Sequence, residues 1–387
     1  DLWSASSQKD QKALEKILLD YSFIFTKRFA AGTVPRDLAE HDIELKEDKI
    51  IRSRQYPLTK SNRDEISTWI RTMLNNGFIR PSSSPFRSPL LVVAKLTSDG
   101  KVKGWRVCFD GRRINALTKS YVGNPPPSTE QIFNDVSGGK LFSVTDFANG
   151  FYNVQMTERA SRICAFADPT DGRLFEFIRL PMGLIGSPAT FARLGSLAFH
   201  ELISTCLQIY VDDICCYSTL AHVNEENLKR KKRGEKEMIT LIGVHALQLE
   251  AMLQRCCKAG LLCSLKKTSC ALPKVSLLGH EVSCDGLRPC PMKTIAMKEA
   301  AAPTDVSGIR RIMGCFSYYR RFIPRFTDST KHIRSMLKKG VHFKWTKEMQ
   351  HEYDIIKGML ASEPLVCPPD YTKKFYVMTD GSKVGLA

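Results

Sequence analysis

The spacing of apolar residues along the chain first predicts helices. One helical pattern runs from Gln11 to Phe25, and a second begins at Ser61, which is spaced from Asp64 as a capping residue would be. Gly77 suits the end of the second helix, because glycine readily adopts the left-handed backbone that closes many helices. The apolar residues of this helix form one stripe that predicts core packing: Ile66, Trp69, Ile70, Met73 and Leu74.

Short apolar runs bounded by turn residues predict strands. A loop rich in serine and proline over 81–89 leads into a predicted strand over 90–95, and 41–45 predicts a shorter extended segment. Asp-Gly pairs predict hairpins at 99–100, at 171–172 and, as a weaker case, at 285–286. Helices are predicted at 128–136 and 187–204, with mainly helical structure from about residue 293. We therefore expect mixed helices and antiparallel strands rather than a repeated strand–helix–strand unit.

Two adjacent carboxylates, Asp212 and Asp213, stand between apolar runs at 206–209 and 214–217. Runs of this kind around a short polar segment predict a β-hairpin with the two aspartates near its tip. Aspartate is common in turns, so one interpretation is a polar turn with no further role. The other is a metal site, because neighbouring carboxylates repel each other and a divalent cation with oxygen ligands relieves that repulsion.

Length and composition limit the kinds of protein to consider. The chain has 387 residues, which suggests two to four domains, and its hydrophobic content of 43% is that of a globular protein. Its apolar runs are too short to span a bilayer. The first residue is Asp1 and no signal-peptide pattern follows, so we expect a fragment or a processed product. Several of the thirteen cysteines fall in apolar runs, so we expect reduced thiols in a cytosolic compartment.

The chain is strongly basic, with a formal charge of +17 from 57 Lys and Arg against 40 Asp and Glu. Such an excess points first to nucleic acid as a partner, with solubility alone as the alternative. Arg310, Arg311 and the segment 318–322 interleave basic and aromatic residues, which suits phosphate contact with base stacking, or else a solvated helix face. Another basic run opens the segment 229–243, where we prefer a solvated loop over a nucleic-acid contact.

A third carboxylate, Asp146, lies in the strand-like run 141–147. Alone, an aspartate in this place is more often a cap or turn residue. Together with Asp212 and Asp213 it suggests a metal site. Three carboxylates on neighbouring strands can hold two Mg²⁺ ions roughly 3.5–4 Å apart for in-line phosphoryl displacement. Mg²⁺ is favoured over Zn²⁺ because all the proposed ligands are oxygens.

Several motifs together resemble the reverse transcriptase of Ty3/gypsy-type LTR retrotransposons. They follow one another in the family's order and extend over most of the chain. The motifs are 77–82 with Ser84-Pro85, 105–115, 143–147, 180–184 with 187–191, the Tyr-Val-Asp-Asp box at 210–213, 277–280 and 318–323. The resemblance rests on this ordered set rather than on the Tyr-Val-Asp-Asp box alone.

The resemblance implies an α+β, multidomain fold. A right-hand polymerase, with fingers, a palm containing an antiparallel sheet, and a thumb, would precede a connection segment and the start of an RNase H-like domain. The expected boundaries are 1–50 for an N-terminal linker from the polyprotein, 51–140 for the fingers with part of the palm, 141–285 for the palm, 286–340 for the thumb, 341–372 for the connection and 373–387 for the truncated RNase H-like start. Within the palm, 229–243 is expected to be an insert.

The resemblance also implies roles for individual residues. Asp146, Asp212 and Asp213 match the catalytic metal ligands. Nucleotide-binding positions are matched by Lys95 and Arg106 on the triphosphate, by Phe151 as a gate against a 2′-OH, and by Met182 and Gly183 at the pocket border. Leu278, Gly279 and His280 match the primer grip, and Asp380 matches the first metal ligand of the RNase H fold. Met182 departs from the usual glutamine or phenylalanine, and the loop after Lys95 is longer than usual.

The implied activity is that of an RNA-directed DNA polymerase, which extends a primer 3′-OH with dNTPs and Mg²⁺, or Mn²⁺ as the alternative ion. RNase H activity is not expected of this fragment alone. Expected partners are an RNA template, a DNA primer–template duplex and, in the full-length product, protease, RNase H and integrase domains, with no membrane. The expected location is the cytoplasm, in a virus-like particle, with the nucleus as the alternative. The rival interpretations are a decayed nucleic-acid-binding relic and a nuclease that uses the same carboxylates.

Overall fold

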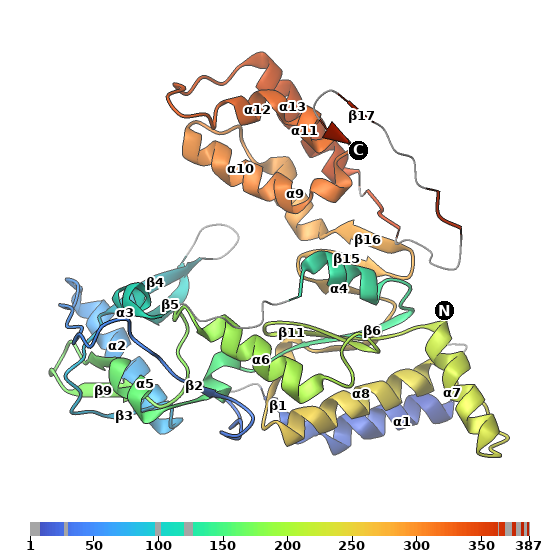
Figure 1. Ribbon diagram of the computed structural model, residues 1–387, viewed down its shortest axis with the longest axis horizontal. Helices are drawn as coiled ribbons and strands as arrows, with labels where there is room; N and C mark the ends of the chain where they lie inside the picture. Colours follow the sequence, from blue (N-terminus) through green and yellow to red (C-terminus); the bar gives the residue numbers. More distant parts are fainter. Residues whose placement is uncertain are drawn as a thin grey trace. The chain divides into compact units, whose positions relative to one another are not determined.

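The computed structural model describes residues 8–26, 30–96, 102–119, 127–362, 364–367, 374–376, 381–382 and 385–386. It combines helices with short sheets that are mostly antiparallel (Figure 1). The chain divides into two compact units, the first made of 1–132 and 140–273 and the second of 133–139 and 274–387. Among the described helices, none has both the length and the apolar character that crossing a membrane requires.

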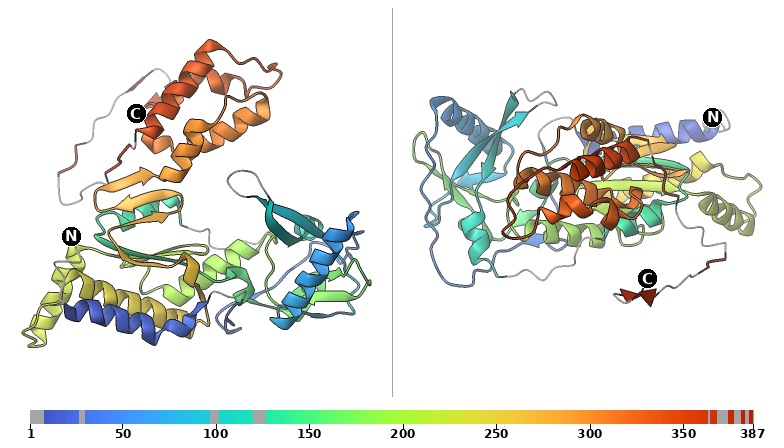
Figure 2. Two further views of the ribbon diagram at one scale, coloured as in Figure 1. Left: turned by 180° about the vertical axis from the view of Figure 1, so that it is seen from behind. Right: turned by 90° about the horizontal axis from the view of Figure 1, so that it is seen from above.

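A four-stranded antiparallel sheet lies at the centre of the first unit. Its strands, in spatial order, are β10 (Leu207–Tyr210), β11 (Asp213–Ser218), β6 (Leu141–Asp146) and β13 (Ser269–Leu272). The side chains of 214–217 are all buried, as their continuous apolar pattern predicts. Helix α8 (Leu241–Lys258) packs on this sheet, and α1 (Gln8–Asp20) lies along α8 (Figures 1 and 2).

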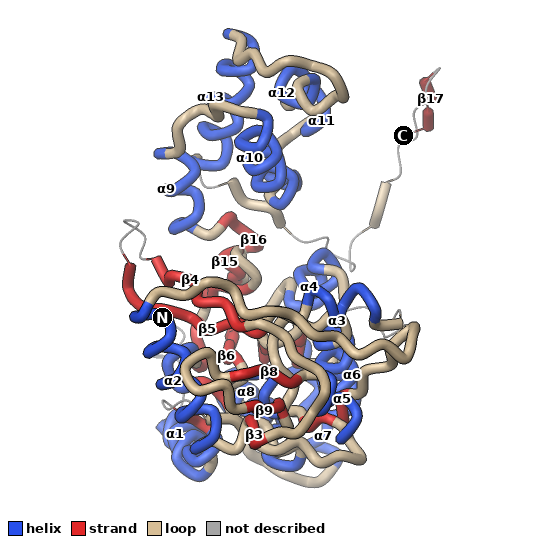
Figure 3. The backbone as a smooth tube through the Cα atoms, turned by 90° about the vertical axis from the view of Figure 1, so that its left-hand side faces the viewer, coloured by secondary structure: helices blue, strands red, loops and turns tan. Residues whose placement is uncertain are grey.

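Short strands and helices around an aromatic core make up the rest of the first unit. The ribbon of β4 (Leu90–Leu96) and β5 (Val102–Phe109) is accompanied by a three-stranded sheet in the order β3 (Ile79–Pro81), β9 (Leu174–Phe177), β8 (Ala165–Ala167) (Figure 3). Trp69 contacts the rings of Phe166 and Phe177, at centroid distances of 5.8 and 6.1 Å. The helices of this part are α2 (Lys60–Asn75), α3 (Arg112–Leu117), α5 (Glu158–Ile163) and α6 (Ser187–Phe199). Two short parallel pairs join β1 (Phe25–Thr26) to β12 (Cys263–Ser264) and β2 (Glu40–His41) to β7 (Gln155–Met156).

The second unit combines a three-stranded antiparallel sheet with helices. Strands β14 (Lys274–Leu277), β15 (His280–Ser283) and β16 (Gly286–Pro289) form the sheet. The helices are α9 (Pro291–Glu299), α10 (Val306–Tyr318), α11 (Phe326–Ser329), α12 (Lys331–Ser335) and α13 (Lys347–Ala361). Helix α4 (Thr129–Val136) spans the boundary between the two units, and a short pair, β17 (Gly381–Ser382) and β18 (Gly385–Leu386), follows near the end of the chain.

Several predicted elements are confirmed. The hairpin with Asp212 and Asp213 at its tip is present, as are hairpins around 171–172 and 285–286. Gly77 has a φ of +65° and follows Asn76, the C-cap residue of α2, as a helix-closing glycine should. The predicted hairpin at 99–100 lies outside the described residues.

Other predicted boundaries are wrong for identifiable reasons. The first helix ends at Asp20, not Phe25, because residues 25–26 pair as a strand with 263–264. Helix α2 is capped by the Thr59 hydroxyl, which accepts from the Asn62 amide, and not by Ser61. Helix α6 ends at Phe199 rather than at 204, since the chain turns there into β10. Within 41–45, only His41 belongs to a strand, and the described residues 374–376 carry no strand.

The segment 229–243 contains the loop that we preferred, at 233–240, but both of its ends are helical. Residues 229–232 form the last turn of α7 (Leu220–Lys232), and α8 begins at Leu241. Threonine caps explain both helices, because Thr219 and Thr240 each accept an amide hydrogen bond at a helix start. Ion pairs join the basic run to nearby glutamates: Lys229 to Glu225, Arg230 to Glu226 and Glu235, and Arg233 to the same two. Much of its charge is therefore balanced locally.

Candidate active site in the first unit

The two strands that carry the predicted catalytic carboxylates are direct neighbours. In the antiparallel ladder of β6 and β11, Asp146 is paired with Asp213, so both side chains lie on the same face of the sheet. Tyr210 pairs with Asp213 in the hairpin of β10 and β11, which leaves Val211 and Asp212 as a two-residue turn. Val211 has a φ of +55°, which a β-branched residue rarely adopts. The fold therefore brings all three predicted carboxylates to one end of the central sheet.

Asp212 occupies an environment that disfavours its own charge. Burial, followed by the charges of Asp146 and Asp213, raises the pKa of Asp212 from 3.8 to about 6. Burial, with Asp146 as the next cause, also raises the pKa of Asp213. The Oδ1 atom of Asp212 is buried and accepts no hydrogen bond from the protein. A buried carboxylate oxygen without a donor is an attractive position for a cation.

Lys267 supplies the positive charge that faces this cluster. Its ammonium group donates to Oδ2 of Asp146 and forms an ion pair with it. This hydrogen bond, together with the charges of the three aspartates, raises the pKa of Lys267. Lys267 in turn lowers the pKa of Asp212, so it partly offsets the repulsion among the carboxylates.

The donor atoms suit a hard divalent ion, although they are not yet arranged as a complete site. Three carboxylates offer oxygens only, and Oδ1 of Asp212 has no competing donor. In the described part of the chain, no group of three or more histidine, cysteine, aspartate or glutamate side chains is arranged to hold a metal ion as it stands. The ion pair with Lys267 occupies one oxygen of Asp146. Ion binding through that oxygen would therefore require Asp146 to release Lys267.

A cavity of about 350 Å³ lies in the same unit. Of the five predicted nucleotide-binding residues, Lys95, Arg106 and Met182 line it. Val93 pairs with Arg106 across β4 and β5, so Lys95, two residues further along, projects from the same face of the ribbon as Arg106. Other lining residues are Glu65, Trp69, Trp105, Asn149 and Tyr152. Two cationic side chains at one cavity can engage a polyanionic group together.

The short helix 150–153 links this cavity to the carboxylates. A Cβ atom on Gly150 would lie 2.3 Å from Oδ1 of Asp212, while its neighbours Asn149 and Tyr152 line the cavity. Phe151 does not line the cavity; its ring packs edge-on against Phe191 at 5.4 Å. Gly183 does not line it either, but its φ of +98° forms the bend directly after Met182.

The predicted primer-grip residues form a tight hairpin in the second unit. Leu278 and Gly279 make the two-residue turn between β14 and β15, with φ values of +46° and +70°. The hydroxyl of Tyr318 donates to the Leu278 carbonyl, and that of Tyr319 donates to the Gly279 carbonyl at 2.8 Å. His280 is buried, which lowers its pKa to about 4. The motif at 318–322 thus supports this turn, and Asp380 lies outside the described residues.

Sequence reasoning missed three features of the first unit. Lys267 and Gly150 touch the carboxylates, yet neither belongs to a motif that we singled out for this role. The third is a strongly cationic cavity of about 690 Å³. Its charged and aromatic lining residues are Arg52, Arg54, Tyr56, Asp110, Arg112 and Arg113. The basic residues at 52–54 and 112–113 were the available signal, and only the fold brings them together.

Comparison with known proteins defines the class of this fold. Residues 95–282 match the family described as reverse transcriptase (RNA-dependent DNA polymerase). The structure is similar to the foamy viral protease-reverse transcriptase solved in complex with an RNA/DNA hybrid, with a TM-score of 0.75 and 22% identity over 94% of this chain and 45% of that one. It is equally similar to that protein in complex with dsDNA, with a TM-score of 0.76 and 23% identity over 95% and 71% of the two chains. The fold is that of a reverse transcriptase polymerase.

Sequence relatives narrow the family. The chain is 30% identical to the retrovirus-related Pol polyprotein from transposon 297 of Drosophila melanogaster, over 90% of this chain and 31% of the relative. It is 28% identical to the Pol polyprotein from transposon gypsy of the same organism, over 89% and 32%. The chain thus spans about a third of the length of these relatives. Residues 95–282 thus belong to the reverse transcriptase family, and the relatives of the chain are Pol polyproteins of gypsy-type LTR retrotransposons, as its motifs predicted.

Proposed function

We propose that this chain is the polymerase portion of a retrotransposon Pol protein and acts as an RNA-directed DNA polymerase. The observation that carries the proposal is the direct opposition of Asp146 and Asp213, with Asp212 in the adjoining turn. Gly150 and its neighbours connect this cluster to a cavity that contains Lys95 and Arg106. A carboxylate cluster beside a cationic cavity suits transfer of a nucleotide from a triphosphate to a hydroxyl group.

Asp146, Asp212 and Asp213 would hold the divalent ions. Two such ions supply activation of the primer 3′-OH and neutralisation of the leaving pyrophosphate. The aspartates contribute negative charge from a rigid sheet end, and burial of Asp212 keeps water away from its Oδ1 atom. Mg²⁺ is our proposal for the ion because the ligand atoms are all oxygens, with Mn²⁺ as the alternative.

Lys95 and Arg106 would bind the triphosphate of the incoming dNTP. Both project from one face of the β4–β5 ribbon and line the same cavity, so their charges act on one ligand. Guanidinium and ammonium groups form the strong charge-assisted hydrogen bonds that phosphate oxygens accept. For Phe151 we keep the proposed role of gate against a 2′-OH, supported by its place in the segment that contacts Asp212.

The nucleic acid would be bound chiefly through its phosphates. The net charge of +17 and the cavity with Arg52, Arg54, Arg112 and Arg113 support this proposal. Arg112 already pairs with Asp110, which holds the pKa of that carboxyl well below its usual value. The remaining arginines are then the principal candidates for template phosphates. We propose that the turn at Leu278 and Gly279 grips the primer, because two tyrosine hydroxyls fix its backbone.

The wider setting is proposed from the relatives. In a full-length Pol polyprotein, protease, RNase H and integrase domains would accompany this chain in a cytoplasmic virus-like particle. We also retain the division into fingers (51–140), palm (141–285), thumb (286–340) and connection (341–372) as a proposal.

Primer extension on poly(rA)/oligo(dT) tests the proposed activity. We expect wild-type protein to incorporate dTTP in the presence of Mg²⁺, and Asp212→Asn to reduce the rate by at least a hundredfold. Asp171→Asn, which changes an exposed hairpin aspartate, is the matched control and should keep the wild-type rate. A wild-type protein that binds the primer–template without incorporation would favour an inactive nucleic-acid-binding protein instead.

A further inference from the structure

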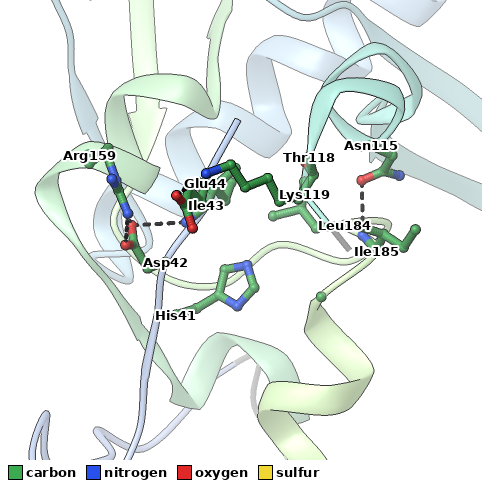
Figure 4. A pocket seen from close by; sticks show the side chains of 11 residues that line it. His41, Asp42, Ile43, Glu44, Asn115, Thr118, Lys119, Arg159, Leu184 and Ile185 are labelled. Atoms are coloured by element: carbon green, nitrogen blue, oxygen red, sulfur yellow. Dashed lines mark hydrogen bonds and ion pairs between the residues drawn. The ribbon is translucent and has the colours of Figure 1, made fainter. Parts of the chain in front are cut away.

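The two halves of the loop that carries Met182 and Gly183 line two different cavities. Pro181 and Met182 line the cavity of about 350 Å³ that also contains Lys95 and Arg106. Leu184, Ile185 and Gly186 line a second cavity of about 160 Å³, together with His41, Asp42, Glu44, Asn115, Thr118, Lys119 and Arg159 (Figure 4). Side-chain packing therefore does not support the loop over its full length.

Packing within the loop is correspondingly limited. The side chains of Met182 and Ile185 are 47% and 59% exposed. Leu184 is buried at 5% exposure and anchors the middle of the loop. Gly183 bends the backbone with a φ of +98° and has no side chain that could pack against its neighbours. Hydrogen bonds must therefore do much to hold this loop in place.

Asn115, in the middle of α3, makes two of these hydrogen bonds with one side-chain amide group. Its Nδ2 atom donates to the Gly183 carbonyl at 2.8 Å. Its Oδ1 atom accepts from the Ile185 amide at 2.9 Å (Figure 4). The pair of bonds fixes the backbone on both sides of Leu184. Glycine at position 111 permits the close approach of α3, since a Cβ there would lie 3.2 Å from Leu184 and 3.4 Å from the Gly183 oxygen.

We propose that Asn115 is a positioning residue that sets the shape of the nucleotide pocket by holding the loop at Met182 and Gly183. This inference rests on the proposed function, because it takes the ligand of the larger cavity to be a dNTP. Asn115 lines only the smaller cavity, so it acts through the loop and does not touch the nucleotide. Its loss should weaken dNTP binding more than it affects the reaction rate or template binding.

Direct binding provides a test that does not depend on turnover. Two of the four tryptophans, Trp69 and Trp105, line the larger cavity, so their fluorescence reports dNTP binding. Asn115→Asp keeps the acceptor for the Ile185 amide but replaces the donor to Gly183 with a repelling oxygen. Asn76→Asp is a matched control, because Asn76 likewise donates to a backbone carbonyl, that of Thr72, and lies at the end of α2 away from the loop.

We expect Asn115→Asp to raise the Kd for dNTP by about fivefold or more, and the KM for dNTP likewise, since a hydrogen bond and a favourable charge distribution are lost together. Its kcat, its affinity for primer–template and its Tm should stay close to those of Asn76→Asp. Unchanged dNTP affinity in Asn115→Asp would overturn the inference, as would a joint loss of Tm, template affinity and dNTP affinity. A wild-type protein that binds dNTP but does not polymerise would contradict the proposed function alone, whereas one that binds no dNTP would overturn both.

Discussion

Gly150 lies directly against Asp212, and the space does not admit a larger side chain at position 150. A Cβ atom at position 150 would be 2.3 Å from Oδ1 of Asp212 and 3.3 Å from the Phe191 ring. Asp212 cannot easily move away, because it occupies a two-residue turn whose Val211 already has a positive φ. The glycine therefore preserves the space in which the carboxylate is oriented.

Substitution of this glycine should impair polymerisation more than folding. We expect Gly150→Ala to displace Asp212 and to lower kcat at least tenfold, with a Tm loss of a few degrees. Primer extension and a thermal melt measure the two effects. Gly358→Ala is the control, because a Cβ at this helical position meets nothing within 4 Å and should stabilise α13 slightly. A rate for Gly150→Ala equal to that of Gly358→Ala would show that Asp212 is not positioned by this contact.

The raised pKa of Asp212 predicts how stability without metal depends on pH. Its pKa is about 6 in the folded protein against 3.8 ordinarily, so folding favours the protonated form. The stability that this group contributes is fully present below pH 3.8 and is lost as the pH rises through about 6. The side chain in Asp212→Asn cannot titrate. In EDTA, the stability of this variant relative to wild type should therefore increase between pH 5 and pH 7, by on the order of 1 kcal/mol. Thermal melts at pH 5, 6 and 7 measure this difference, and a constant difference would contradict it.

The central sheet was predictable because short stretches of the sequence specify each of these strands. The apolar runs around 210–213 specify two strands and their tip, and the pattern ending in Asp146 specifies a third. Contacts between distant segments were not predictable in the same way. Lys267 reaches Asp146, and residues 25–26 pair with 263–264, through packing that no local pattern encodes. Two helix boundaries, predicted at Phe25 and at residue 204, were wrong for the same reason. At both places, tertiary pairing overrode the helical spacing of apolar residues.

Lys267 should act as the counter-ion of the carboxylates when metal is absent. Lys267→Gln removes the charge that pairs with Asp146, so the three aspartates repel one another without compensation. In EDTA we expect a Tm several degrees below that of Lys266→Gln, which changes the neighbouring exposed lysine. Addition of Mg²⁺ should raise the Tm of Lys267→Gln more than that of wild type, because the ion replaces the missing charge. Equal Mg²⁺-induced shifts in all three proteins would refute this role.

The turn at Leu278 and Gly279 should depend on the tyrosine hydroxyls beneath it. Tyr319→Phe removes the 2.8 Å hydrogen bond to the Gly279 carbonyl, a loss of about 1 kcal/mol, and leaves the ring packing in place. If this turn grips the primer, the Kd for primer–template should rise about three- to tenfold while the Kd for dNTP stays unchanged. Tyr353→Phe is the control, since it removes hydroxyl contacts to Ala300 and Ala301 in the same unit, away from the turn. Equal primer–template affinities for the two variants, measured by fluorescence anisotropy, would argue against a primer grip at this hairpin.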